Sequence, residues 1–239
     1  MISVLIPSNS VRVHSTVAHL LDMDVSVDYE IIVCSSRKLN INHKRVKIIR
    51  DPDGNIGSIA PVNECLKASQ GDYFFSTPDD HLPHRNCFNI QQFIEETHHF
   101  KNREYKITST GWRDRPFCGP VAFITGTLMP NGLTNPLVGI LAMPAGARST
   151  VENLLGGVIF NETFMHVAAD NFLSLYVASK EHPPVFMPDT ECGRDYEHSD
   201  HEELRDRDRR AYFALVKYFT ENPNMPYNYV LDYNDEDVE

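Results

Sequence analysis

The sequence lacks the features that would place it in several large classes of protein. Its five cysteines are scattered, odd in number and free of any C-x-x-C pair, which argues against a disulfide framework or a zinc knuckle and favours a reducing compartment. No apolar stretch approaches the roughly 20 residues of a membrane span, and no signal-peptide pattern precedes the first apolar run. We therefore expect a cytoplasmic protein without a membrane span.

Two phosphate-binding fingerprints are also missing. No G-x-G-x-x-G follows the first apolar run and no G-x-x-x-x-G-K-[ST] occurs anywhere, which argues against a dinucleotide fingerprint and against a P-loop. There is no excess of positive charge either, because 33 acidic residues outnumber 22 basic ones and the formal charge is -11. Such a composition favours solubility and gives no strong electrostatic sign of nucleic-acid binding.

What the sequence does contain is an alternation of strand and helix patterns. Residues 2–7, 30–34, 46–50 and 72–77 form short, continuously apolar runs rich in β-branched and aromatic side chains, typical of central strands buried on both faces. Helical spacing occupies residues 10–23, and residues 58–71 offer Ser58 as N-cap and Gly71 as a stop. The alternation predicts an α/β fold with a parallel sheet wound by right-handed crossovers.

The second half of the chain is less regular. Residues 111–146 are dense in glycine and proline and predict strands and long loops that cover a cleft. Helices are expected to start near Ser149, to span residues 165–180, and to span residues 202–219 with an apolar face. We predict one domain over residues 1–222, with a nucleotide-sugar-binding half (1–105) and an acceptor-side half (106–222), followed by an acidic tail over residues 223–239.

The stretch GDYFFSTPDDHLPH, residues 71–84, places Asp79 and Asp80 directly after an apolar run. In parallel sheets, ligands bind beyond the carboxyl ends of the strands, where the loops PSNS, CSSRK and TPDDH should share one cleft. Two adjacent carboxylates cannot both be hidden without a cation, and oxygen ligands suit Mg²⁺ or Mn²⁺ completed by substrate phosphates. The alternative is a solvated turn whose aspartates cap a helix beginning near His84, with His81 as a surface partner. Spacing alone does not decide between them.

Several segments, taken in order, resemble family 2 glycosyltransferases of the GT-A fold. SVLIPSNS resembles that family's first strand and P-T-x-N loop, and residues 54–81 resemble its N-x-G-x-x-x-x-x-N and A-x-G-D-Y to D-D block. GGVIFNETFMHVAADNFLSL is similar to the G-G-x-F-D-E and E-D-x-D-L segment, and YEHSDH resembles a late histidine segment. Together these matches cover most of residues 2–220.

The resemblance implies a GT-A (Rossmann-like) fold with a mostly parallel central sheet flanked by helices. It also implies a metal-dependent inverting glycosyltransferase that moves a sugar from a nucleoside-diphosphate sugar, a UDP-sugar in the first instance, to a hydroxyl of a glycan, protein, lipid or modified nucleobase. Asp80 with Asp79 would bind Mn²⁺ or Mg²⁺, His198 could complete the metal site, and Asp170 would be the general base. The donor would be contacted by Pro7, Ser8, Asn9, Ser35, Asn55, Gly57, Asn63 and Asp79.

The chain also departs from the family pattern. Cys34 and two serines stand where the family places an Asp that reads the base, and Ala169 replaces the Glu before Asp170. Asp170 by itself also fits a plain helix N-cap. Two other functions stay open: a nucleotidyltransferase, although the glycine-rich basic loop expected after the first strand is missing, and a non-catalytic nucleotide- or sugar-binding module.

Further residues have two interpretations each. Trp112 could stack on a sugar ring or base, or be half-buried packing. Arg113, Arg115 or Arg148 could meet a diphosphate or pair with local acids. His198 lies in a cluster of polar residues that could equally be solvated.

Overall fold

The computed structural model of the chain describes residues 1–51, 57–97, 107–109, 127–128, 134–135, 144–180, 185–186, 193–194 and 202–232. Within these residues, a central sheet of seven strands has the order β10-β6-β9-β4-β1-β2-β3. Pairings β1·β2, β2·β3, β1·β4 and β6·β10 are parallel, whereas β9 is antiparallel to both β4 and β6. The strands are β1 (Ile2–Pro7), β2 (Tyr29–Ser35), β3 (Val46–Arg50), β4 (Tyr73–Ser76), β6 (Ile107–Ser109), β9 (Pro144–Ala147) and β10 (Val185–Phe186).

Two small pairs of strands stand outside this sheet. β5 (His81–Leu82) is antiparallel to β11 (Gly193–Arg194), and β7 (Thr127–Leu128) is antiparallel to β8 (Thr134–Asn135). β5 begins at His81, directly after the aspartates at positions 79 and 80, so the first pair lies next to them.

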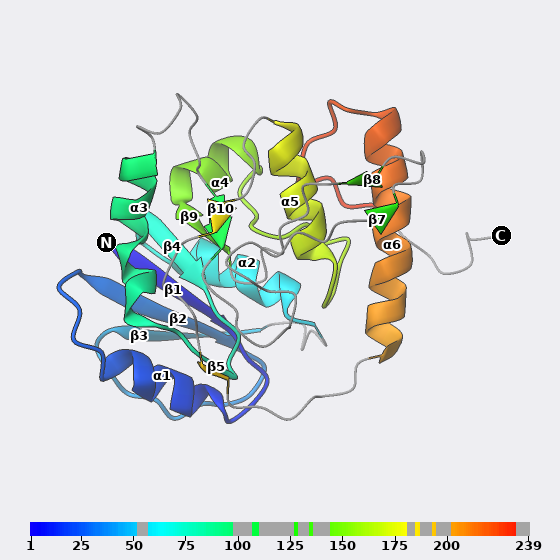
Figure 1. The fold of residues 1–239 in the computed structure, drawn as a ribbon. Coiled ribbons are helices and arrows are strands. Elements are labelled where there is room, and N and C mark those ends of the chain that lie inside the picture. The colour runs from blue at the N-terminus through cyan, green and yellow to red at the C-terminus, as the bar shows by residue number, and fades with distance from the viewer. Residues whose placement is uncertain are drawn as a thin grey trace.

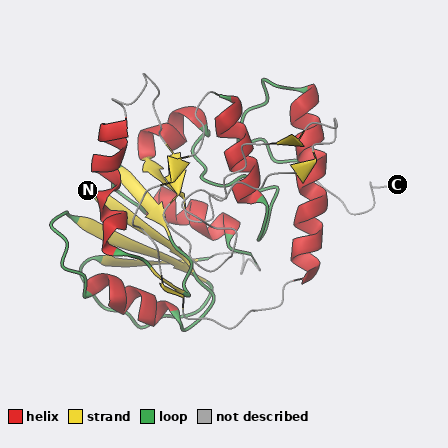
Figure 2. Ribbon diagram, viewed as in Figure 1, coloured by secondary structure: helices red, strands yellow, loops and turns green. Residues whose placement is uncertain are grey.

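Helices cover both faces of the sheet, as Figures 1 and 2 show. Successive residues of β1 explain the layers, because Val4 and Ile6 join one apolar cluster and Leu5 joins the other. The first cluster includes α1 (Val13–Leu21), the 3-10 turn η1 (Arg85–Asn89) and α3 (Ile90–Thr97). The second includes α2 (Ile59–Ala68), α4 (Arg148–Leu154), α5 (Ala169–Ser179) and α6 (Glu202–Glu221). The predicted α/β class with a mostly parallel sheet flanked by helices is confirmed.

Local structure differs from the sequence pattern at two helix starts. Ser58 is the N-cap residue of α2 but makes no side-chain capping bond, and its backbone N–H instead donates to the Met165 carbonyl at 3.0 Å. The helix expected over residues 165–180 begins only at Ala169, because Ala168 has a φ of 63°. A left-handed residue cannot continue an α-helix in either direction, so residues 165–168 form a loop.

The polypeptide beyond α6 folds back onto the protein. Met225 and Tyr227 are buried in the same apolar cluster as α5 and α6, and the Tyr227 ring stacks on Phe172 with centroids 5.7 Å apart. The packed chain therefore extends to about residue 231, past the boundary expected at residue 222. Most of residues 111–146, predicted as strands and loops over the cleft, lies outside the described residues. No helix in the described part of the chain has the length and apolarity to cross a membrane.

Candidate functional site

Three loops meet at the carboxyl-end edge of the sheet. β1 pairs with β2 on one side and β4 on the other, so all three strands end together. Ser8, after β1, donates from its hydroxyl to Asp79 Oδ2 at 2.6 Å, and Ser36, after β2, donates to Asn9 Oδ1 at 2.8 Å. The predicted convergence of these loops is confirmed by these direct hydrogen bonds.

Asp79 belongs to the turn of residues 77–81, here called the acid turn, which follows β4. Thr16 of α1 fixes this turn by donating to the backbone carbonyls of Asp79 (2.8 Å) and His81 (3.1 Å). Burial raises the pKa of the Asp79 carboxyl, and the neighbouring Asp80 charge raises it further. The Ser8 hydrogen bond and the Arg12 charge oppose this rise. The ionised form of this half-buried carboxyl is therefore less favourable in the folded protein than it would be in water.

Asp80 is paired with the next residue. Its Oδ1 lies 2.6 Å from Nδ1 of His81, and the side chains of Asp80 and His81 are 18% and 3% exposed. His84 is the N-cap of η1, and its own side chain accepts from the Asn86 N–H. The alternative that the two aspartates cap this helix is therefore wrong, and so is the interpretation of His81 as a surface group.

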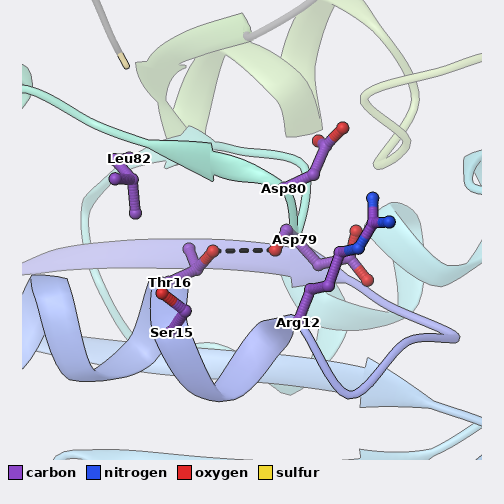
Figure 3. A pocket seen from close by; sticks show the side chains of 6 residues that line it. All are labelled: Arg12, Ser15, Thr16, Asp79, Asp80 and Leu82. Atoms are coloured by element: carbon purple, nitrogen blue, oxygen red, sulfur yellow. Dashed lines mark hydrogen bonds between the residues drawn. The ribbon is translucent and has the colours of Figure 1, made fainter. Parts of the chain in front are cut away.

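Figure 3 shows how the charged side chains of the acid turn lie. Asp79 lies beside the guanidinium of Arg12, which extends from the start of α1, whereas the Asp80 carboxylate points to the other side of the turn. Both aspartates and Arg12 line one small pocket together with Ser15, Thr16 and Leu82.

The donor atoms of the acid turn are compatible with a hard divalent cation. Asp79 uses its Oδ2 atom to bind Ser8, and Asp80 uses its Oδ1 atom to bind His81. Each carboxylate also has a second oxygen, and carboxylate oxygens are ligands that Mg²⁺ and Mn²⁺ prefer. Burial, and after it the Asp80 charge, raises the pKa of Asp79, and a cation bound there would oppose this rise. Among the described residues, however, no group of three or more His, Cys, Asp or Glu side chains could hold a metal. A cation here would need further ligands, such as phosphate oxygens or water.

Two residues expected to touch the nucleotide make internal contacts in the structure. Asn63 is fully buried, donates to the Phe160 carbonyl (2.8 Å) and to Glu162 Oε1 (3.0 Å), and accepts from the backbone of Ile159 and Phe160. Both the nitrogen and the oxygen of the Asn63 amide are therefore hydrogen-bonded, and they connect α2 to residues 159–162. Gly57 is needed for close packing, since a Cβ there would lie 1.8 Å from the Met165 carbonyl oxygen.

The other predicted contacts divide into three groups. Pro7 ends β1 opposite Cys34, and Ser35 is buried with its hydroxyl accepting from the Arg37 N–H at 3.1 Å, so Ser35 shapes the loop after β2. Arg148 binds the carbonyls of Leu66, Ser69 and Gly71 at the end of α2, so neither a diphosphate role nor a local acid pair fits it.

Five candidates lie outside the described residues, namely Asn55, Trp112, Arg113, Arg115 and His198. β11 nevertheless ends four residues before His198 and pairs with β5 at the acid turn.

Asp170 lies in the first turn of α5, two residues after the left-handed Ala168. Phe172 N–H donates to the Ala168 carbonyl at 3.0 Å. Ala168 therefore occupies the N-cap position just before α5, and Asp170 does not. Ala in this conformation is strained by about 1–3 kcal/mol and persists only where its surroundings impose it. Burial raises the pKa of Tyr227 well above its usual value, and the Asp170 charge adds to this shift.

The surroundings that impose this geometry centre on Asp208, a residue that the sequence analysis missed. Its carboxylate is fully buried in α6 and accepts from three successive backbone N–H groups, those of Met165, His166 and Val167, at 2.6 to 3.1 Å. Arg207 donates to the same carboxylate at 2.9 Å. The spacing from Leu204 through residue 208 to Tyr212 places Asp208 in line with the apolar face of α6, and this is the one sequence signal for its burial.

Comparisons with known proteins agree with this architecture. No family model matches the chain, and no curated protein matches it in sequence. Among solved structures, a mannosyltransferase from Pyrobaculum calidifontis in complex with GDP-Man and Mn²⁺ is similar with a TM-score of 0.60, 17% identity, and coverage of 94% of this chain and 64% of that one. TarS 1-349 from S. aureus in complex with UDP-GlcNAc is similar with a TM-score of 0.59, 12% identity, and coverage of 90% and 66%.

The identities are low, and this chain spans under two thirds of the length of both structures. The likeness therefore establishes the fold and not the substrate. The prediction of the GT-A fold is confirmed, since the chain shares its architecture with these glycosyltransferases.

Proposed function

We propose that the protein is a metal-dependent inverting glycosyltransferase that moves a sugar from a nucleoside-diphosphate sugar to an acceptor hydroxyl. A single observation carries the proposal: in a GT-A fold, three strand-end loops are joined in series, Ser36 to Asn9 and Ser8 to Asp79, at a turn with two adjacent aspartates, one of which is half-buried with a raised pKa. Ligands of α/β sheets bind at this edge, and perturbed carboxylates cluster at functional sites.

Asp80 and Asp79 would hold the cation, Mn²⁺ or Mg²⁺, and His198 is the candidate further ligand. When bound, such a cation would neutralise the charge that builds on the departing nucleoside diphosphate. Ser8 and Thr16 keep the acid turn in place through their bonds to Asp79, so the carboxylates need no large reorganisation before the donor arrives.

Asp170 would act as the general base. The acceptor oxygen attacks the anomeric carbon from the face opposite the diphosphate, the bond from that carbon to the diphosphate oxygen breaks, and the hydroxyl proton passes to the Asp170 carboxylate. Attack from the opposite face inverts the anomeric configuration. Asp208 and Ala168 fix the loop that leads into Asp170, which supports a role that depends on its position.

Binding of the donor can be tested by thermal unfolding with Mn²⁺ and UDP, GDP or dTDP. A nucleotide at about 100 times its dissociation constant adds about 2.7 kcal/mol of stability, which for a chain of this size raises the melting temperature by about 5–11 °C. The rise should require both metal and nucleotide. A protein indifferent to every metal and nucleotide combination would refute the proposal.

Catalysis can be separated from binding with Asp170→Asn. If the protein is an enzyme, this variant should still bind the nucleotide but lose about 100- to 10,000-fold in sugar transfer or in hydrolysis of a sugar nucleotide, the usual contribution of a general base. GDP-mannose and UDP-GlcNAc, the donors of the similar structures, begin the panel. The alternative of a non-catalytic module, favoured by Ala169 in place of an acid, predicts nucleotide binding without turnover in wild type and variant alike.

A further inference from the structure

A cationic side chain from the start of α1 lies beside the acid turn. Arg12 is exposed at the start of α1, and its side chain extends toward Asp79 in the pocket that both residues line (Figure 3). Within the described part of the chain, no hydrogen bond or ion pair engages its guanidinium, although its charge lowers the pKa of Asp79.

The backbone of Arg12 is held in place even though its side chain is not. Its N–H donates to Ser10 Oγ at 3.1 Å, and its carbonyl accepts from the N–H groups of Ser15 (2.9 Å) and Thr16 (3.4 Å) in the first turn of α1. The guanidinium is therefore a charge on a fixed anchor, close to the loop after β1 and to the acid turn.

Three other arginines of the described chain are engaged in internal contacts. Arg148 binds carbonyls at the end of α2, Arg207 binds Asp208 and the Thr163 carbonyl, and Arg45 lies over the Tyr29 ring. Arg12 differs from these three arginines because its guanidinium has no hydrogen-bond or ion-pair partner among the described residues and lines the same pocket as Asp79 and Asp80.

The charges at the proposed cation site indicate a role for Arg12. Two carboxylates and one divalent cation sum to zero charge, which leaves the negative charge of a diphosphate uncompensated. A guanidinium matches two phosphate oxygens with a planar pair of N–H donors. We propose that Arg12 binds the diphosphate of the nucleotide, as a second positive group beside the metal. This inference rests on the proposed function and adds to it the residue that contacts the phosphates.

The test compares Arg12→Gln with wild type in titrations of Mn²⁺ with UDP and GDP, followed by calorimetry. Loss of a charge-assisted pair of hydrogen bonds should weaken the tighter-binding diphosphate roughly 10- to 100-fold. Binding of the matching nucleoside, uridine or guanosine, followed by ligand-observed NMR, should be unchanged. Arg209→Gln is the matched control, because it removes the same charge from an exposed arginine of α6 that pairs with Asp206.

The outcomes separate this inference from the proposed function. Both variants should melt within about 2 °C of wild type without ligand, since their side chains are at the surface. If Arg12→Gln binds the diphosphate as tightly as wild type, or loses equal affinity for nucleoside and diphosphate, the assignment of Arg12 to the phosphates is overturned while the proposed function stands. If wild type binds neither nucleotide with metal, the proposed function is refuted and this inference with it.

Discussion

Replacing Asp208 by Asn should destabilise the protein severely although the two side chains have the same shape. The carboxylate receives three backbone N–H groups and the Arg207 guanidinium, and it is fully buried. Removing one partner of a buried ion pair costs about 3–5 kcal/mol, because the remaining charge is left uncompensated. Asn keeps one acceptor oxygen, so we expect the lower end, about 3 kcal/mol, out of a typical total of about 5–15 kcal/mol.

Two measurements check this expectation. Urea unfolding should show the loss of about 3 kcal/mol, and thermal unfolding a melting temperature lower by about 6–12 °C. Native-state hydrogen exchange should show faster exchange at the amides of residues 165–167, because these N–H groups donate to the lost carboxylate.

Asp206→Asn is the matched control. Asp206 lies two residues earlier on α6, is exposed, and pairs only with Arg209 among the ion pairs of the described chain. Exposed pairs contribute little, so a change of under about 0.5 kcal/mol is expected. If Asp208→Asn were as mild as this control and left the exchange at residues 165–167 unchanged, the assignment of Asp208 as the anchor of this loop would be refuted.

Two further predictions concern the acid turn and its neighbours. Because the pKa of Asp79 in the folded protein lies above its usual value of 3.8, the folded state binds the proton more tightly, and the free energy of unfolding should fall as pH rises through that raised pKa. Asp79→Asn should lack this decrease, should be more stable than wild type at neutral pH without metal, and should lose stabilisation by Mn²⁺; equal pH profiles in urea unfolding would contradict this. Gly57→Ala should cost about 1–3 kcal/mol, since its Cβ would overlap the Met165 carbonyl oxygen, and an unchanged melting temperature would show that the loop moves freely.

The parts of the fold that were predictable depend on local patterns. The continuous apolarity of residues 2–7 and 72–77 marks strands buried on both faces, and such strands end at a common edge, so the position of Asp79 and Asp80 followed from the sequence. Their surroundings did not follow. That Ser8 binds Asp79 depends on the parallel register of β1 and β4, which joins residues 71 positions apart.

The roles of Asn63 and Asp208 were hidden for a similar reason. Asn63 resembles a ligand residue in a family motif, but its four hydrogen bonds go to three residues that lie almost 100 positions away in sequence. Asp208 stands within the run RDRDRR, which looks like a solvated helix face. Its spacing from Leu204 and Tyr212 indicates the inward face of α6, but the backbone N–H groups that make an anion site there come from packing against residues 163–167.

The contrast between Asp208 and Asp79 supports a ligand at the acid turn. Asp208 is more deeply buried, yet three N–H donors and an arginine stabilise its charge. Asp79 has one hydroxyl donor and an arginine too distant for an ion pair, and it stands beside another carboxylate. A hydrogen bond from Ser8 could be accepted equally well by an uncharged amide, which would avoid the cost of burying a charge. Holding Ser8 therefore does not require a carboxylate at position 79, whereas a carboxylate is the protein ligand through which Mg²⁺ is usually bound.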